Sequence, residues 1–157
     1  MFFSVEFGIG KEVEPRFYNT ECATATLLRA IRDDAVAVIA SQIDVKVAEY
    51  KREIPRLEQE IADTQSVPKG AKPGKAEEWK QELQRIKTNL PKLEELLPLL
   101  VKVVKVDLSF TEATTGRLNL DFEAYAYANT FFQAKCRTWL VGITADSNDG
   151  FMLKWDL

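Results

Sequence analysis

The fold of this chain is set first by residues 1–9, MFFSVEFGI, in which apolar side chains occupy every second position. One face carries Met1, Phe3, Val5, Phe7 and Ile9. The other face carries a mixed set that includes a serine and a glutamate. A period of two is the pattern of a strand that is buried on one side. Residues 1–9 therefore predict a strand that begins a sheet.

A second strand and then a helix are predicted from the residues that follow. Val13–Tyr18 suits a strand, and Pro15 places it at an edge or a bulge because proline has no N–H. Asn19 and Thr20 are candidate helix N-caps. The period then changes from two to three and four, which is typical of an amphipathic helix. Its apolar stripe is Leu27, Leu28, Ile31, Ala35, Val38 and Ile39.

Two heptad patterns occupy the middle of the chain. The first contains Ile43, Val47, Tyr50, Ile54, Leu57 and Ile61. The second contains Trp79, Leu83, Ile86, Leu90, Leu93, Leu97 and Leu100. Residues 66–75 between them are polar and rich in Pro, Gly and Lys, which predicts a flexible tip. Two narrow seams joined by a tip predict an antiparallel helical hairpin with coiled-coil packing. In that packing Ile61 faces Trp79 and Val47 faces Leu93.

Three prolines interrupt these heptads: Pro55, Pro91 and Pro98. A proline inside a helix removes a hydrogen bond at a cost of about 3 kcal/mol. Because Pro55 and Pro91 lie close together in the predicted pairing, one shared bend would accommodate both. Proline is equally acceptable in a first helical turn, so several shorter helices are the alternative.

The pattern returns to a period of two after the heptads. Val104–Phe110 predicts a strand, and Leu118–Phe122 predicts its return strand. Cys136–Thr144 is apolar on both faces and predicts a central strand. Asp146–Gly150 predicts a hairpin turn before a last strand over Phe151–Leu157. The chain is thus predicted to be α+β, with a discontinuous body of residues 1–42 and 101–157 and a helical insertion over residues 43–100.

Without the insertion, the predicted order is β-β-α-β-β-β, the order of the ubiquitin-like β-grasp. Residues 1–8, MFFSVEFG, and the helix start NTEC at residues 19–22 resemble a group of small ubiquitin-like proteins, as does the strand RTWLVGI at residues 137–143. The resemblance covers residues 1–35 and 104–144. It implies a ubiquitin-like β-grasp body carrying the coiled-coil arm. Because relatives of that group occur mostly in ciliated organisms, it also implies a place in the cilium or axoneme.

The amino-acid composition argues against most catalytic and metal-binding functions. The 157 residues include no histidine, which removes the commonest general base and metal ligand. The net charge is -3 with interspersed signs, so neither a nucleic acid nor a membrane surface is an expected partner. Cys22 and Cys136 are expected to be free, buried thiols of a cytoplasmic protein. We expect no enzyme, no small-molecule substrate, no cofactor and no metal.

Two surfaces are candidates for binding another protein. One is the outward face of the sheet, with Phe2, Arg137 and Trp139, because aromatic and arginine side chains anchor protein interfaces. An alternative is that the last strand and Trp155 cover Trp139. The other surface is the arm, where Val45, Ala48 and Leu96 lie off the heptad positions.

These features predict a structural protein whose body and arm bridge partners in a large, cytoskeletal or axonemal assembly. The alternative is a chaperone or assembly adaptor that uses the arm transiently.

Overall fold

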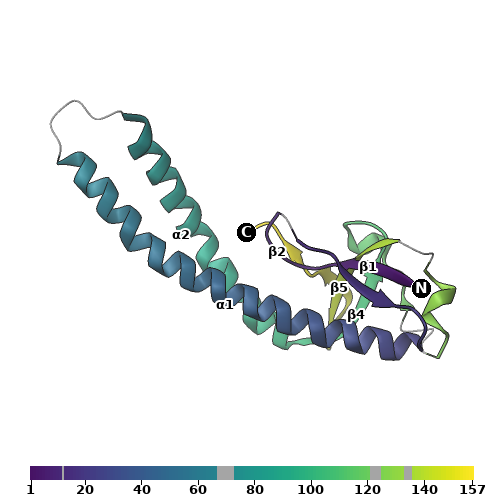
Figure 1. The fold of residues 1–157 in the computed structure, drawn as a ribbon. Coiled ribbons are helices and arrows are strands. Elements are labelled where there is room, and N and C mark those ends of the chain that lie inside the picture. Colours follow the sequence, from purple (N-terminus) through teal and green to yellow (C-terminus); the bar gives the residue numbers. More distant parts are fainter. Residues whose placement is uncertain (12, 67–72, 121–124, 133–135) are drawn as a thin grey trace. The chain divides into compact units, whose positions relative to one another are not determined.

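The computed structural model describes residues 1–157 except 12, 67–72, 121–124 and 133–135 (Figure 1). It divides into two compact units. The body comprises Met1–Gln42 and Pro98–Leu157, and the arm comprises Ile43–Leu97. The two boundaries, Gln42–Ile43 and Leu97–Pro98, each fall inside a continuous helix. The predicted flexible tip, residues 66–75, lies largely outside the described residues.

The body is built on a mixed sheet with strand order β3-β1-β5-β4, in which β6 also pairs with β5. The bounds are Phe2–Glu6 for β1, Arg16–Asn19 for β3, Val103–Ser109 for β4, Arg137–Thr144 for β5 and Ser147–Met152 for β6. The β1–β5 pair is parallel and the other pairs in this sheet are antiparallel. The short strands β2 (Gly8–Ile9) and β7 (Lys154–Trp155) form a separate parallel pair. The protein is therefore α+β, with a mixed sheet.

The core of the body lies between α1 (Thr24–Gln65) and one face of this sheet. The predicted stripe supplies the helix side: Leu27, Leu28, Ile31, Ala35 and Ile39 are buried, whereas Val38 is half-buried. Phe3 and Val5 of β1 are fully buried, as the alternation of residues 1–9 predicts. The ring of Phe3 stacks on Phe132 with centroids 4.3 Å apart. Full burial of each large aliphatic side chain contributes about 2 kcal/mol.

The N-terminus of α1 differs from the prediction. Asn19 and Thr20 do not cap it: the Asn19 Oδ1 accepts a hydrogen bond from the Glu21 N–H (3.0 Å), and the Thr20 hydroxyl donates to the Met1 carbonyl (3.1 Å). These side chains close the turn after β3 instead, a use that competes with capping. The helix starts at Thr24, whose N–H and hydroxyl both donate to the Ala126 carbonyl at 2.9 and 2.8 Å.

Polar contacts fasten the strands to α1 at two places. The Tyr18 hydroxyl donates to Asp34 at 2.5 Å, and burial together with that carboxylate raises the pKa of Tyr18 far above its ordinary value. The Ile9 N–H donates to the Gln42 side-chain oxygen at 3.0 Å. Gly8 is needed there, since its φ is +129° and a Cβ would lie 2.7 Å from that oxygen.

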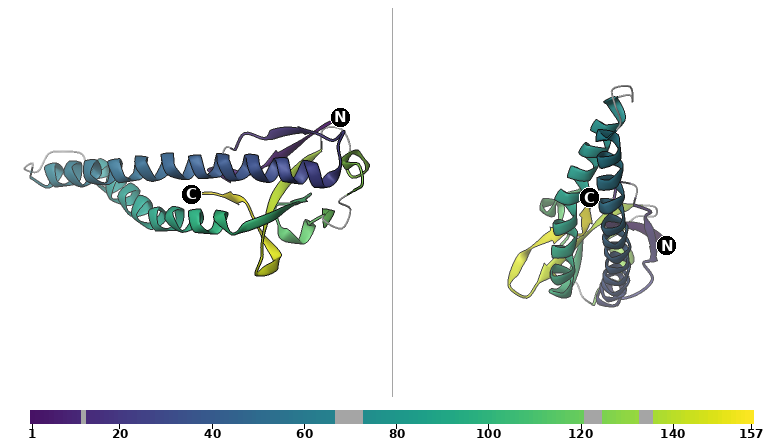
Figure 2. Two further views of the ribbon diagram at one scale, coloured as in Figure 1. Left: turned by 90° about the horizontal axis from the view of Figure 1, so that it is seen from below. Right: turned by 90° about the vertical axis from the view of Figure 1, so that its left-hand side faces the viewer.

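The C-terminal half departs from the predicted strands. Residues 118–120 of the predicted return strand form no strand, and its residues 121–122 lie outside the described residues. The 3₁₀ turn Thr114–Gly116 leads to one bridge between Ser109 and Arg117. The β5–β6 turn lies at residues 145–146 rather than over Asp146–Gly150, because Thr144 pairs with Ser147 (the yellow hairpin in Figure 2). The predicted last strand is also broken at Leu153, so its end pairs with β2.

A buried carboxylate holds the segment that takes the place of the return strand. Asp107 is fully buried, and the Arg117 Nε lies 2.6 Å from its Oδ2. Its Oδ1 accepts from the N–H groups of Leu108 (2.8 Å) and Leu120 (3.2 Å). The Arg117 guanidinium continues to the Asn148 carbonyl at 2.5 Å. The Asp107 side chain thus ties residues 117–120 to β4 in addition to the Ser109–Arg117 bridge and the Leu118–Leu108 backbone hydrogen bond.

The arm pairs the end of α1 with α2 (Pro73–Val101). Lys51 bonds to Glu94 (2.8 Å) and Lys87 to Glu58 (2.6 Å), so the two helices run antiparallel. Tyr50, Leu57, Ile86 and Leu93 of the predicted seams are buried. The residue-by-residue pairing of the seams stays a prediction.

The prolines do not break these helices. Pro55 lies inside α1, and Pro91 and Pro98 lie inside α2, so the alternative of several shorter helices is wrong. Pro55 and Pro91 are exposed, where water can satisfy the carbonyls that lose their helical donors. The predicted first helix and the first arm helix are also one helix.

We predict that Asp107→Ala lowers the free energy of unfolding by about 3 kcal/mol, because it breaks a buried ion pair and removes the acceptor of two backbone N–H groups. Chemical denaturation measures the loss. Asp149→Asn, at an exposed position, serves as the control and is expected to change little. Equal stability of Asp107→Ala and the wild-type chain would contradict this role for Asp107.

We also predict that Leu57→Asp opens the arm and leaves the body folded, because a charge at this buried position disrupts only the local packing. Hydrogen exchange is expected to accelerate at residues 46–62 and to stay slow in β5. Arg52→Asp, at an exposed position of the same helix, is the matched control. Equal acceleration in the arm and in β5 would show that the two units unfold together.

Candidate protein interface on the outer sheet face

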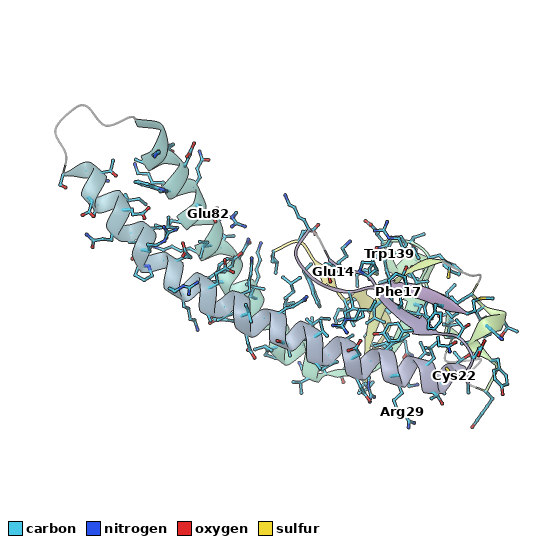
Figure 3. The ribbon with its side chains drawn as sticks, viewed as in Figure 1. Glu14, Phe17, Cys22, Arg29, Glu82 and Trp139 are labelled. Carbon is cyan, nitrogen blue, oxygen red and sulfur yellow. The ribbon has the colours of Figure 1, made fainter. Side chains whose placement is uncertain are left out.

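The face of the sheet opposite the core carries an aromatic and charged cluster. In the strand registers Phe17 and Arg137 both pair with Ser4, and Trp139 pairs with Glu6. Paired residues of neighbouring strands share a face, and Phe2 shares it by alternation with Ser4. We call Phe2, Phe17, Arg137 and Trp139 the outer-face cluster. Figure 3 shows Phe17 and Trp139 on the same side of the body.

Phe2 and Phe17, two of the three aromatic members of the cluster, are strongly exposed to solvent. Phe17 is 68% exposed and Phe2 is 59% exposed. Trp139 is half-buried, and the Arg137 guanidinium lies 5.2 Å from the centroid of its ring. Large exposed apolar side chains that gather on one face, beside an arginine stacked on a tryptophan, are typical of protein interfaces. The strand that carries Phe17 ends the sheet, so its outer edge has no strand partner in the described part of the chain.

A buried carboxylate fixes the charged end of this cluster. The Glu6 side chain is almost inaccessible, and it accepts hydrogen bonds from the Arg137 Nε and from the Lys154 ammonium, the latter at 3.3 Å. Burial by itself would raise the pKa of Glu6, but the two cations outweigh it and hold the pKa below its ordinary value. Glu6 therefore stays ionised and keeps the Arg137 guanidinium beside Trp139.

The indole of Trp139 carries an unusual feature. Its Nε1 is buried, and among the described residues it has no hydrogen-bond partner. The Trp155 ring, predicted as an alternative cover for Trp139, lies 6.5 Å from the Phe151 ring, centroid to centroid. The Arg137 guanidinium lies over the Trp139 ring. Cover of Trp139 by the last strand and Trp155 stays a prediction.

The three predicted binding residues on the arm differ in their exposure to solvent. Val45 is 66% exposed and Ala48 is also exposed on α1, so both are accessible. Leu96 is buried with 8% exposure, so its prediction as a binding residue is wrong. Its place off the heptad series suggested an outward side chain, but in a packed helix pair residues beside the seam are also covered.

Sequence reasoning missed Phe17. Phe17 lies in the predicted second strand. Pro15 and the charged residues near Phe17 predicted only that this strand is at an edge, not that it contributes to a binding surface. Only the pairing with Ser4 shows that Phe17 joins Phe2 on the outer face. Alternation along β3 alone does not say which face of the sheet is covered by the helix.

The described part of the chain holds no group of Cys, Asp and Glu side chains that is arranged to bind a metal ion. Cys22 is a free thiol, and both Cys22 and Cys136 are half-buried rather than fully buried. Neither of the described helices combines the length and apolar character that a bilayer span requires. No protein-family model, curated protein or solved structure matches the chain.

We predict that Glu6→Gln lowers the melting temperature at pH 7, because Arg137 and Lys154 lose their charged partner. A carboxyl with a lowered folded pKa stabilises the protein above its ordinary pKa of 4.5, and this stabilisation is lost as pH falls through the folded pKa. The gap between variant and wild type is therefore expected to shrink in acid. Thermal unfolding over a pH series measures it.

Glu14→Gln is the matched control, since Glu14 is exposed and makes no ion pair in the described structure. A gap for Glu6→Gln that stayed constant as the pH fell would argue against an ionised, stabilising Glu6.

Proposed function

We propose that this protein is a non-catalytic interaction protein, whose body docks on one partner and whose arm reaches a second. The observation that carries the proposal is the exposure of Phe2 and Phe17 on the same sheet face as the Arg137–Trp139 pair. Exposed aromatic rings are costly to leave in water, and they become anchors when a partner covers them. The open edge of β3 beside Phe17 offers backbone groups to the same partner.

A β-grasp identity for the body is part of this proposal. It is supported by β1 lying parallel to β5 inside the sheet, by β3 antiparallel to β1, and by α1 packing on one face. This arrangement suits the resemblance of residues 1–35 and 104–144 to small ubiquitin-like proteins. That resemblance is also the support for a large cytoskeletal assembly, of the cilium or axoneme, as the setting.

The arm is the proposed second contact. Its exposed ion pairs contribute little to stability, so its apolar seam must supply most of what holds the helices together. Val45 and Ala48 on its outer surface are free for a partner. A chaperone or assembly adaptor is the alternative function, and it would use the same surface in a short-lived complex.

We predict that the double variant Phe2→Ser, Phe17→Ser weakens binding of the body's partner by at least about tenfold, as loss of aromatic anchors does. Affinity purification from native cells, with quantitative mass spectrometry, identifies the proteins lost. Tyr125→Ser is the matched control, since Tyr125 is 97% exposed and lies outside the sheet. A separate set of proteins is expected to be lost with Val45→Glu, Ala48→Glu.

Retention of an identical set of proteins by all these variants would contradict the bridging function. Proteins that stay bound through high salt support a permanent structural component. Proteins that exchange rapidly with a free pool support the adaptor instead.

A further inference from the structure

A second possible binding site lies on the body, on the edge of the sheet opposite β3. A cavity of about 300 Å³ opens between the first turns of α1 and the strand β4. Its floor is formed by the buried side chains of Leu28, Val106 and Leu120. Its rim carries Arg29, Arg32 and Lys105. We call this site the α1–β4 groove.

Among the described residues that line the α1–β4 groove, the charged side chains are all basic. Arg32 is already engaged, with Asp33 at 2.7 Å and with the Val104 carbonyl at 3.0 Å. Arg29 and Lys105 are exposed, and neither makes an ion pair with another described residue. No acidic side chain is among the described residues that line the cavity. An apolar floor with two unpaired cations at its rim is complementary to an aliphatic side chain flanked by carboxylates.

Some backbone N–H and carbonyl groups of β4 face the outer edge of the sheet. Leu108 turns its polar groups toward the outer edge, since its N–H donates to Asp107 and its carbonyl accepts from the Leu118 N–H at 2.9 Å. Because edge-facing residues alternate in an antiparallel pair, Val106 turns its own N–H and carbonyl outward as well. Residues on either side of Val106 are occupied at this edge: the Val104 carbonyl by Arg32, and Leu108 by the segment that follows β4. Among the described residues, no group pairs with the outward N–H and carbonyl of Val106, which lies directly beside the apolar floor.

We propose that the α1–β4 groove binds an extended acidic segment of a partner protein. One aliphatic side chain of that segment enters the cavity, its backbone pairs with Val106, and its flanking Asp or Glu side chains meet Arg29 and Lys105. A peptide that adds to a sheet edge gains affinity from backbone hydrogen bonds and specificity from the side-chain pocket. Figure 3 shows Arg29 reaching away from Phe17 and Trp139, so this site is separate from the outer-face cluster.

The test uses the full chain and a fluorescent peptide in which Val and Ile are flanked on both sides by Asp and Glu. Fluorescence anisotropy gives the affinity, and amide chemical shifts of the labelled protein locate the peptide. Two control peptides are used: one with each acidic residue replaced by Lys, and one with the central amide N-methylated. Binding of the acidic peptide alone, with shifts centred on Val106, is the expected result.

Three variants separate the parts of the site. Ala25→Trp fills the groove from an exposed helix position, and Ala30→Trp makes the same change on another face of α1. We expect the first to weaken binding by at least about tenfold and the second to leave it unchanged. The double variant Arg29→Glu, Lys105→Glu is expected to weaken binding roughly tenfold, as removal and reversal of two rim charges does. Arg52→Glu, Lys92→Glu is the charge-matched control on the arm.

Binding that is insensitive to Ala25→Trp, equal binding of the Lys-flanked peptide, or the absence of binding would each overturn the proposal. Phe2→Ser, Phe17→Ser is expected to bind the acidic peptide normally. The α1–β4 groove can therefore be confirmed or rejected independently of the outer-face cluster.

Discussion

Packing of the α1 stripe against the sheet is the contact on which the body depends. Ile31, Ala35 and Ile39 are completely buried on the helix side, and Phe3 and Val5 are completely buried on the sheet side. Because one face of β1 is committed to this core, a shift of a single residue in its register would place Phe3 and Val5 in water. The same commitment fixes which side chains face outward. The outer-face cluster is therefore a consequence of how the core is packed.

Two buried carboxylates, Asp107 and Glu6, have different structural roles. Asp107 replaces a missing strand pair, since it gathers backbone donors and Arg117 around a segment that has almost no ladder of its own. Glu6 lies on the outer face and holds Arg137 and Lys154 at the surface. Buried carboxylates are stable only when cations and donors surround them, so each one organises its neighbours. Asp107 thereby closes the fold at residues 117–120, whereas Glu6 holds the side chains of the outer face in a preorganised arrangement.

The two proposed sites on the body differ in chemistry and belong to different edges of the same sheet. The outer-face cluster presents exposed aromatic rings beside the open edge of β3, whereas the α1–β4 groove presents an aliphatic floor with unpaired cations. In the described part of the chain, the β3 edge is open to strand pairing, whereas the β4 edge leaves only the Val106 position for it. The proposed bridging function uses these sites together with the exposed α1 surface of the arm.

Local patterns in the sequence determined the α+β class, the buried face of β1, the helix stripe and the two arm helices, because periodicity reports directly which face of an element is covered. Tertiary structure decided the rest. The helix starts at Thr24 because Asn19 and Thr20 bond to the neighbouring turn and strand, and the helices continue through Pro55 and Pro91 because those positions are exposed. Phe17 joins the outer face only through its register with β1. The α1–β4 groove brings residue 29 beside residue 105, and no local pattern encodes a contact between residues so far apart in the chain.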